Sequence, residues 1–524
     1  MASLKSRPDD VKRRENSTAL RDYSCYVLLL IPIILFLGSL YIPPTMISDS
    51  GVGFLALRSM LDGGAFNCFI APDPANIAND VVTFMTRWSP GQYLMPGIFI
   101  WLGTSYGVAL SLTTLIATLI GMVGWIQVAR SFAVSSFVLF VFVLGLNTFP
   151  YVTQRFLSYW GGELLLFATA SWSLYAMLWS TNKPPTLCFT ISLLSAALLF
   201  FAKLTGLIVF ATNVVAISLT ALVNHRRLDS SIIAMWVASA IAALCFMMFW
   251  VGRGPVVAEM STIHFSWFPI LFSVANAAFS GIYGVALFLA HPWMQINLQW
   301  ATGLLGPLGL LLMVWVWYGL RHTRYRNMTV LLLTIVLMYS IATSIILYLW
   351  GVISFEDRHF RYAGILFFLL LVTAVDQWRV PLAKGLVLAV VIVLGLYGLR
   401  NYATFAYAQV RAGYYDPMSG ISQEMSPAIL EYMRSEVTRH NFQRPIAAIP
   451  SPSAAISLPK FRIILIGWDR QPLKWAGRAE KIFVVVPEEM LLNNEAEAIL
   501  RSFTDYDFDK WSQMKLGGMI IYTQ

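Results

Sequence analysis

Long apolar stretches without a single charged side chain run through most of this chain. The segments 107–128 and 329–350 are two examples, and each can cross the hydrocarbon core of a bilayer as a helix, which takes about 20 residues. Only 12% of the 524 residues are charged, whereas roughly 25% are charged in an average soluble domain. The sequence therefore predicts an α-helical polytopic membrane protein. It excludes a soluble globular protein, a disordered chain, a disulfide scaffold and a collagen-like fibre.

We expect about eleven transmembrane helices. They are predicted near residues 25–42, 107–128, 133–149, 160–180, 187–202, 204–222, 231–251, 299–318, 329–350, 362–378 and 384–400. With these spans a set of basic residues at span ends falls on the cytoplasmic side, as the positive-inside rule requires: Arg130, Lys183, Arg226, Arg227, the Arg321–Arg326 cluster, Arg379 and Lys384. The apolar segment 271–290 would break this pattern if it crossed, so we expect an interfacial or re-entrant helix there. The segment 93–102 is too short to cross alone.

The distribution of charge gives the expected orientation. The net charge of +9 comes entirely from residues 1–400, since residues 401–524 contain 13 Lys/Arg and 13 Asp/Glu. Positive charge at span ends is a topology signal, and no nucleic-acid partner is expected. Residues 1–24 are expected to be a cytoplasmic tail before a first span that is not cleaved. We expect a multi-pass plasma-membrane protein, with a bacterial inner membrane favoured and the C-terminus extracytoplasmic.

The remaining chain divides into a membrane domain and an outer domain. The membrane domain is predicted to comprise residues 25–400 and to include a long outer loop, residues 43–92. In residues 401–524, strand-like apolar runs alternate with helix-like runs, which predicts a small extracytoplasmic α/β domain.

Acidic and aromatic residues gather in the outer loop. Asp49 lies a few residues beyond the first span, where a charge close to hydrocarbon is costly unless it has a partner or a function. Asp73 and Asp80 follow it, and then Trp88 and Tyr93, which flank Ser-Pro-Gly-Gln and suit a rigid aromatic platform against a lipid headgroup or a sugar ring. The simpler interpretation of Asp49 is a solvated loop acid or a helix cap.

Basic residues gather at other outer span ends. Arg358 and Arg361 lie with His359 between two spans, and arginine can bind phosphate through two donors without losing its charge. Such a patch can bind the phosphate of a lipid carrier, although side chains that snorkel to the interface are the alternative. Lys203 is either another phosphate contact or a membrane anchor. Glu163 opens a span, where interaction with the helix dipole is the simpler role.

Motifs for other chemistry are missing from the sequence. It contains no glycine-rich nucleotide loop, no zinc-protease motif and no serine-hydrolase elbow. The four cysteines form no Cys-x-x-Cys motif and no Cys/His pair at zinc spacing, so no structural metal is expected. No cofactor is certain, and a divalent cation is left open.

Four motifs in this order resemble the C-type (GT-C) glycosyltransferase superfamily, especially the branch with protein O-mannosyltransferases and the aminoarabinose-to-lipid A transferase. The resemblance covers roughly residues 25–400. The motifs are an Asp after the first span (Asp49 in Ser-Asp-Ser-Gly), the Pro-containing aromatic stretch Trp88 to Tyr93, the turn Lys203-Leu-Thr-Gly, and the pair Arg361-Tyr362 that opens a late span.

The resemblance implies an enzyme that transfers a hexosyl or pentosyl sugar from a polyprenyl-phosphate donor, with inversion, at the extracytoplasmic face. The acceptor would be a glycan, a lipid or a protein, and membrane lipid would surround the enzyme. The implied roles are catalytic base for Asp49, donor-phosphate contacts for Arg358, Arg361 and Lys203, and pocket wall for Trp88, Tyr93, His359 and Tyr362. Relatives often carry a paired acid, whereas Ser50 follows Asp49. A second acid would then be Asp73, Asp80 or Glu163.

Two other functions remain open. A lipid-linked glycan flippase or transporter predicts inverted repeats and charged residues inside spans, and the sequence shows charges mainly at span ends. A non-catalytic envelope-assembly subunit would not need acids, cations and aromatic residues gathered on one face.

Overall fold

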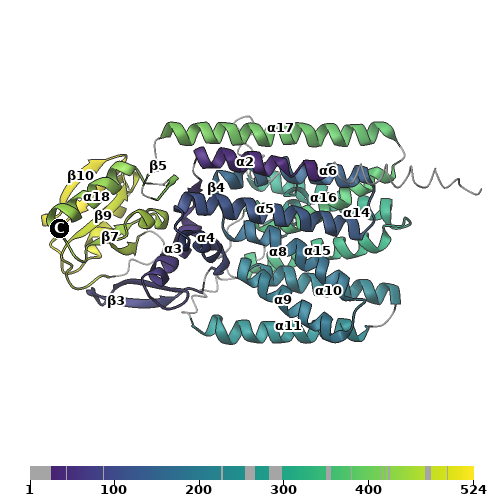
Figure 1. Cartoon of the computed structure of the whole chain (residues 1–524), viewed down its shortest axis with the longest axis horizontal. Helices are drawn as coiled ribbons and strands as arrows, with labels where there is room; N and C mark the ends of the chain where they lie inside the picture. Colours follow the sequence, from purple (N-terminus) through teal and green to yellow (C-terminus); the bar gives the residue numbers. More distant parts are fainter. Residues whose placement is uncertain are drawn as a thin grey trace, which may run out of the picture.

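The structure is a computed structural model with a bundle of long helices and a smaller sheet-containing domain at one end of it (Figure 1). It describes residues 25–42, 44–86, 88–225, 228–253, 266–281, 298–349, 356–378, 380–412, 415–417, 419–422, 425–466, 474–492 and 494–524.

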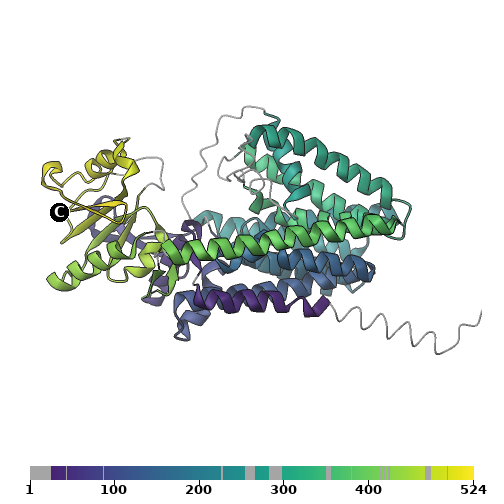
Figure 2. The same ribbon diagram turned by 90° about the horizontal axis from the view of Figure 1, so that it is seen from above.

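The helices of the bundle run along its long axis (Figures 1 and 2). In chain order they are α2 (Leu30–Tyr41), α5 (Tyr106–Ser131), α6 (Ser136–Thr148), α7 (Pro150–Thr153), α8 (Gly162–Ser180), α9 (Pro185–Ala202), α10 (Gly206–His225), α11 (Ser230–Phe249), α12 (Phe268–Phe279), α14 (Leu298–Leu320), α15 (Arg326–Leu349), α16 (Arg361–Gln377) and α17 (Pro381–Ala412). Apolar residues on all sides of most of these helices fit a bundle surrounded by lipid.

Every predicted span coincides with one of these helices. In the described part of the chain, eight helices are long and apolar enough to cross a membrane, or nine if the bent pair of residues 136–148 and 150–156 is one span. The spans predicted at 25–42 and 160–180 correspond to α2, which is short, and α8, which carries Glu163 and several hydroxyl residues. The multi-pass helical fold is thus confirmed, with eight or nine clear spans among the described residues.

The apolar segment predicted at 271–290 begins as α12. This helix has 12 residues, too few to cross a bilayer, and it is buried among α14, α15 and α16. Residues 282–297 of this region lie outside the described part. The segment predicted to be too short at 93–102 is α4 (Gly91–Trp101), an 11-residue helix interrupted by Pro96.

The two ends of the bundle differ in character. At the end away from the sheet domain, Arg130 donates to the hydroxyl of Tyr26 at 2.7 Å, and Lys384 pairs with Asp376 at 2.6 Å. At the other end, the first turn of α5 approaches the C-terminal part of the chain, because the N–H of Gly107 donates to the carbonyl of Ser419. Arg130 and Lys384, two basic residues predicted to be cytoplasmic, therefore lie on the side opposite the sheet domain.

A layer of short elements covers the end that carries the sheet domain. It contains β1 (Thr45–Met46), α3 (Ser48–Leu61), the antiparallel hairpin of β2 (Cys68–Asp73) and β3 (Asn76–Phe84), α4, the 3-10 helix η1 (Gln154–Phe156), β4 (Ser158–Tyr159), β5 (Tyr415–Asp416) and β6 (Ile421–Ser422). Four of the strands form one small sheet in the order β4-β1-β6-β5. Segments far apart in sequence therefore meet directly above the bundle.

The C-terminal domain is built on a five-stranded sheet in the order β10-β11-β9-β7-β8. Its elements are α18 (Pro427–His440), β7 (Ile446–Ile449), η4 (Pro452–Ser457), β8 (Arg462–Leu465), β9 (Ile482–Pro487), α19 (Glu489–Leu492), α20 (Glu495–Arg501), η5 (Phe508–Lys510), β10 (Ser512–Leu516) and β11 (Met519–Thr523). One apolar core joins the sheet to α18, and a second joins its other face to α20. This arrangement confirms the predicted α/β fold of the C-terminal part.

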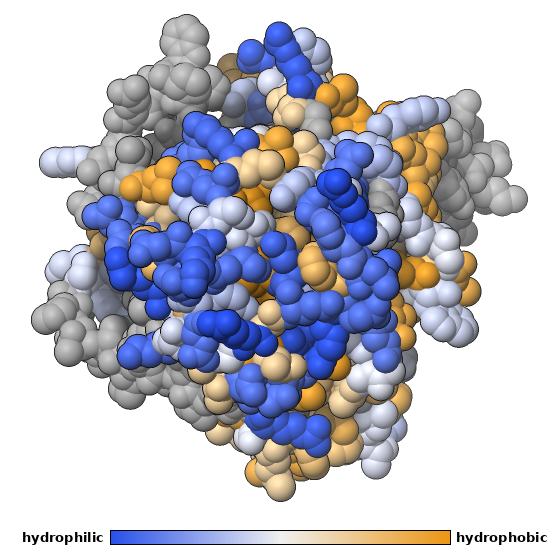
Figure 3. Space-filling model, turned by 90° about the vertical axis from the view of Figure 1, so that its left-hand side faces the viewer, coloured by the Kyte–Doolittle hydropathy of each residue, from blue (hydrophilic) through white to orange (hydrophobic). Residues whose placement is uncertain are grey.

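The helix α17 connects the bundle to this domain. It has 32 residues and runs through the expected boundary between residues 400 and 401 without a break (Figures 1 and 2). Seen from the domain's end, the molecule presents a mostly hydrophilic face, with apolar residues towards the sides (Figure 3). The domain therefore suits an aqueous environment, while the bundle suits lipid.

A buried carboxylate fastens the end of α17 to the C-terminal domain. Asp416 has no exposed surface; it accepts a hydrogen bond from the Ser419 hydroxyl at 3.0 Å and pairs with Arg434 of α18 at 3.2 Å. Burial acts to raise the pKa of Asp416, but hydrogen bonds from Ser457 and Ser419 and the charge of Arg434 bring it below its ordinary value of 3.8. A depressed pKa adds stability that is present above the unfolded-state value and is lost as the pH falls through the folded-state value.

We therefore expect acid to weaken this attachment. The apparent unfolding temperature of the C-terminal domain should fall as the pH drops below about 4. The Asp416→Asn variant should be less stable at neutral pH and should lose less further stability over the same acid range. Unfolding temperatures recorded across that range for both proteins test this. Parallel pH profiles would contradict the role of Asp416.

Candidate functional site

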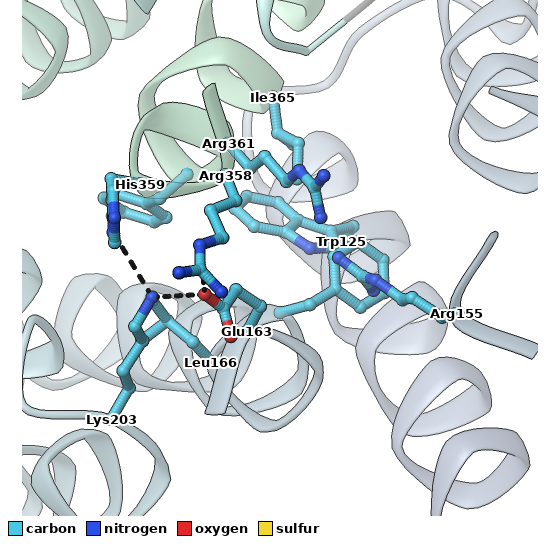
Figure 4. Close-up of a pocket in the computed structure, with 11 residues that line it drawn as sticks. Trp125, Arg155, Glu163, Leu166, Lys203, Arg358, His359, Arg361 and Ile365 are labelled. Carbon is cyan, nitrogen blue, oxygen red and sulfur yellow. Dashed lines mark hydrogen bonds and ion pairs between the residues drawn. The ribbon is translucent and has the colours of Figure 1, made fainter. Parts of the chain in front are cut away.

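A small cavity lies in the bundle at the end nearest the C-terminal domain. It has a volume of about 20 Å³, room for roughly one water molecule. Its charged lining consists of Glu163 and four cations, which we call the cation cluster: Arg155, Lys203, Arg358 and Arg361. His359, Tyr362 and the apolar residues Trp125, Leu166, Phe167 and Ile365 complete the lining (Figure 4).

The cluster arises because four element ends converge. Arg155 lies in η1, Glu163 in the first turn of α8, Lys203 directly after α9, and Arg361 at the start of α16. Glu163 and Arg361 lie in the first turn of an apolar helix, and Lys203 follows the last turn of another. Antiparallel packing of these helices brings the three residues together.

Two glycines allow the close approach before α8. Gly161 has φ +51°, a conformation that L-residues with a side chain rarely adopt, and a Cβ there would lie 3.0 Å from the Ser50 hydroxyl. A Cβ on Gly162 would lie 3.1 Å from the Lys203 side chain. This turn therefore contacts α3 on one side and the cation cluster on the other.

Glu163 is the only acid that lines the cavity in the described part of the chain. Its Oε1 accepts a hydrogen bond from Lys203 Nζ at 2.6 Å and lies 3.6 Å from Arg358 Nε (Figure 4). Burial lowers the pKa of Lys203, and the Glu163 carboxylate opposes that shift. Glu163 thus holds Lys203 in place and offsets part of the positive charge.

Positive charge nevertheless exceeds negative charge around the cavity. The four cations face one carboxylate, which leaves an excess of three charges. Glu356 pairs with Arg358 from outside the lining, and with it the excess is two. Burying uncompensated cations is costly unless an anion binds among them, so this arrangement suits an anionic ligand.

Arg155 is a buried arginine with N–H donors that have no partner in the described structure. It is 2% exposed, and neither its Nε nor its Nη1 has a hydrogen-bond partner in the described structure. Its guanidinium stacks near Phe167 at 4.7 Å and near Tyr151 at 5.3 Å, and Arg361 lies over the same Tyr151 ring at 5.4 Å. The aromatic rings hold the two guanidinium groups in place and leave N–H donors for a ligand.

His359 and Tyr362 support the cluster from α16 and the turn before it. The Nδ1 of His359 lies 3.5 Å from Lys203 Nζ, and its carbonyl accepts from the Tyr339 hydroxyl at 2.7 Å. The Tyr362 hydroxyl donates to Asn213 at 2.6 Å. Both residues line the cavity.

Six of the predicted site residues thus come together at one cavity. They are Glu163, Lys203, Arg358, His359, Arg361 and Tyr362. The cavity also contains Arg155, to which the sequence analysis assigned no role. Arg155 could have been identified in the sequence as a basic residue beside an outer span end, as Lys203 was.

Two predicted acids lie elsewhere. Asp73 accepts from the N–H of Ala75 in the exposed turn between β2 and β3. Asp80 pairs with Arg444 and Arg462 of the C-terminal domain. Neither lines the cation cavity, so Glu163 is the candidate second acid that the fold brings to it.

The two aromatic residues of the outer loop also lie outside the cavity lining. Tyr93 is fully buried, and its hydroxyl donates to the Asn67 side chain at 2.5 Å. Trp88 is half-buried against the apolar cluster that contains Tyr93. Both support the packing of α3 and α4.

Asp49 lies in the first turn of α3, and its side chain is outside the described part. The neighbouring residue locates that turn, because the Ser50 hydroxyl donates to the carbonyl of Tyr159 at 3.3 Å. Tyr159 is followed within a few residues by the Gly161-Gly162 turn that contacts Lys203. The start of α3 is therefore connected to the cation cluster through one short loop.

A divalent cation has no evident donor set in the described residues. No group of three or more His, Cys, Asp or Glu side chains gathers among them. The Oε1 of Glu163 is already engaged by Lys203.

The Glu163–Lys203 pair gives a testable stability effect. Removing one partner of a buried ion pair typically costs about 3–5 kcal/mol of stability. The cost of Glu163→Gln should lie near the lower end of this range, because the Lys203 side chain is 17% exposed. Thermal unfolding in detergent measures this. The matched control is the double variant Glu163→Gln with Lys203→Met, which removes both charges and should recover part of the loss. Equal losses in the single and double variants would contradict the interpretation.

Comparisons with solved structures identify proteins with a similar fold. No protein-family model and no curated protein matches this chain. Among solved structures, ArnT from Cupriavidus metallidurans bound to undecaprenyl phosphate is similar with a TM-score of 0.57 and 12% identity, over 95% of this chain and 97% of that one. The oligosaccharyltransferase AglB from Archaeoglobus fulgidus, solved with an inhibitory peptide and a dolichol-phosphate, is similar with a TM-score of 0.50 and 12% identity, over 95% of this chain and 74% of that one. This chain therefore shares the GT-C fold of these two structures.

Proposed function

We propose that this protein is an integral membrane glycosyltransferase that uses a polyprenyl-phosphate-linked sugar as its donor. The observation that carries the proposal is the cation cluster, because its buried Arg155 and Arg361 have N–H donors without a partner in the described structure, at the end of a lipid-facing bundle where a lipid phosphate can bind. The fold supports the same class of reaction, since ArnT was solved with undecaprenyl phosphate and AglB with a dolichol-phosphate.

The charge of the cavity suits the departing carrier better than the intact donor. A sugar joined to polyprenyl phosphate is a phosphodiester with one negative charge. Breaking the bond between the anomeric carbon and the phosphate oxygen leaves the electron pair on phosphate, which then carries a second charge. Arg155, Arg361 and Lys203 can stabilise this charge as it develops. An interaction that strengthens in the transition state is one that accelerates the reaction.

Asp49 is proposed as the catalytic base. The acceptor hydroxyl oxygen forms a bond to the anomeric carbon while its proton passes to the Asp49 carboxylate, and the carrier phosphate leaves from the opposite side with inversion. The connection of the first turn of α3 to the cluster through Tyr159 and Gly161-Gly162 supports this role. The acceptor would reach the site from the face that carries the C-terminal domain, which is proposed to be extracytoplasmic.

The test uses purified protein in nanodiscs with radiolabelled polyprenyl-phosphate sugars and a membrane extract as acceptor source. We expect the label to leave the carrier and to enter an acceptor of glycan, lipid or protein type. If label stays on every carrier tried, although the protein is folded and binds polyprenyl phosphate, catalysis would be excluded. A flippase would then be identified by movement of the intact labelled carrier between leaflets.

A further inference from the structure

The proposed base lies on a helix that contacts both the bundle and the C-terminal domain. We propose that the C-terminal domain sets the position of α3, and through it of Asp49, with Arg58 as the positioning residue. This inference rests on the proposed function. It assigns the domain a part in catalysis although no residue of the domain lines the described cavity.

Arg58 makes the most extensive polar contact between α3 and the domain. Its Nη1 donates to the carbonyls of Ala455 and Leu458 at 3.0 and 3.2 Å, and its Nη2 donates to the carbonyl of Phe461 at 2.9 Å. These carbonyls belong to the end of η4 and the turn before β8, where those of Ala455 and Leu458 also accept the backbone N–H groups of Leu458 and Phe461. A planar guanidinium spreads its donors over a fork that reaches three acceptors at once, whereas a lysine ammonium holds its three donors on one nitrogen.

Apolar and backbone packing reinforces this contact along α3. A Cβ on Gly51 would lie 2.6 Å from the backbone nitrogen of Ser453, so the helix rests directly on the backbone of η4. One turn further along, Leu55 is 1% exposed and belongs to the apolar core that includes α18 and the central strands of the domain. Gly51, Leu55 and Arg58 thus form one stripe along α3 that faces the domain.

The opposite side of α3 contacts the bundle. The Ser50 hydroxyl donates to the carbonyl of Tyr159, and a Cβ on Gly53 would lie 2.8 Å from the Tyr93 ring. The helix therefore fills the space between the bundle and the domain, as its position between them in Figure 1 indicates. A displacement of its domain-facing stripe must be transmitted to its first turn.

The sequence of α3 makes it dependent on these contacts. It contains two glycines, which are among the weakest helix formers, and its N-cap residue Ile47 provides no side-chain hydrogen bond. A 14-residue helix with these features has little stability of its own. Its formation and position therefore depend on packing against its neighbours, and the domain supplies the contacts of one whole side.

A separate contact between loop and domain gives a matched control. Arg444 pairs with Asp80 of β3, away from α3, and it also bonds the carbonyl of Ala78. It is the same residue type at the same junction, but it acts on the β2–β3 hairpin. If any loss of interdomain contact lowered activity, Arg444→Gln would act like Arg58→Gln.

The experiment compares wild type, Arg58→Gln, Arg58→Lys and Arg444→Gln in the nanodisc transfer assay. For both Arg58 variants we expect kcat to fall by roughly 10-fold to 100-fold, since displacement of a reacting group by about 1 Å can cost about 100-fold. The donor KM and the affinity for polyprenyl phosphate should stay unchanged, because the cation cluster is not altered. Arg444→Gln should keep the wild-type kcat.

Hydrogen–deuterium exchange supplies a readout that does not need activity. Amides in the first two turns of α3 should exchange faster in the Arg58 variants, while amides of the bundle and of the sheet domain keep their protection. Arg58→Lys keeps the charge and the aliphatic stem, so it serves if Arg58→Gln does not fold. Unchanged exchange in α3, unchanged kcat, or a kcat loss matched by Arg444→Gln would overturn the inference. Absence of transfer in wild type would instead contradict the proposed function, and the exchange comparison would still decide the role of Arg58.

Discussion

Replacing Asp49 with asparagine is expected to abolish sugar transfer while the affinity for polyprenyl phosphate stays at the wild-type level. Asparagine has nearly the shape of aspartate but cannot accept the acceptor's proton, and loss of general-base catalysis costs about 100-fold to 10,000-fold in rate. Carrier binding depends on the cation cluster, which this substitution leaves intact. Transfer rates and carrier binding measured on the same preparation give the result.

The control for this prediction is Asp73→Asn. Asp73 lies in the same outer loop, but its carboxylate is engaged in the hairpin turn and does not line the cavity. Its variant should transfer sugar normally. Normal transfer by Asp49→Asn would remove Asp49 from the base role, and loss of transfer in Asp73→Asn would identify a second acid of the outer loop.

The second large effect concerns Arg155, the residue that sequence reasoning did not assign. Arg155→Gln should weaken binding of polyprenyl phosphate by roughly 10-fold to 100-fold, because hydrogen bonds to charged groups contribute about 1.5–3 kcal/mol. The effect should be large because the guanidinium is buried and two of its nitrogens have no other partner in the described structure. Equilibrium binding of polyprenyl phosphate in detergent measures it, with Arg361→Gln expected to act in the same direction.

Arg253→Gln is the matched control for the arginine series. Arg253 is exposed in η2 (Val251–Arg253), near the ring of Phe84 in β3 and outside the cavity, so its removal changes net charge at the same end of the protein without touching the cluster. Its variant should bind the carrier normally. An equal loss in Arg253→Gln would indicate general electrostatic attraction, and no loss in Arg155→Gln would show that the phosphate binds elsewhere.

The helices and most of the cation cluster could be predicted because their signals are local. A long apolar run without charges predicts a membrane helix from the run alone. A charged residue at the end of such a run, such as Lys203 or Arg361, can be recognised in the same way. In the C-terminal part, the strand-like apolar runs at 445–449, 462–466, 482–486 and 519–522 correspond to β7, β8, β9 and β11, because short apolar runs separated by polar turns identify strands. The edge strand β10 was not predicted, because it contains only two apolar residues, Met514 and Leu516, and so has no apolar run.

The features that depend on distant contacts could not be predicted. The loop of residues 43–92 contains a hairpin whose residue Asp80 pairs with Arg444 and Arg462, more than 360 positions further along the chain. Nothing near Arg58 in the sequence indicates that its partners are carbonyls close to residue 458. The role of Arg155 likewise depends on aromatic rings from other elements. Such pairings follow from tertiary packing, which a single sequence does not encode locally.

The small sheet β4-β1-β6-β5 has a consequence for the order in which the protein is made. Its strand β1 comes early in the chain, whereas β5 and β6 follow all the helices of the bundle. Chains are synthesised from the N-terminus, so bundle helices enter the membrane while β1 and α3 still lack their later partners. The carbonyls that accept hydrogen bonds from Arg58 belong to residues that are synthesised later still. With the proposed role of Arg58, a nascent chain that is fully inserted would still lack a positioned α3 until its last domain has folded.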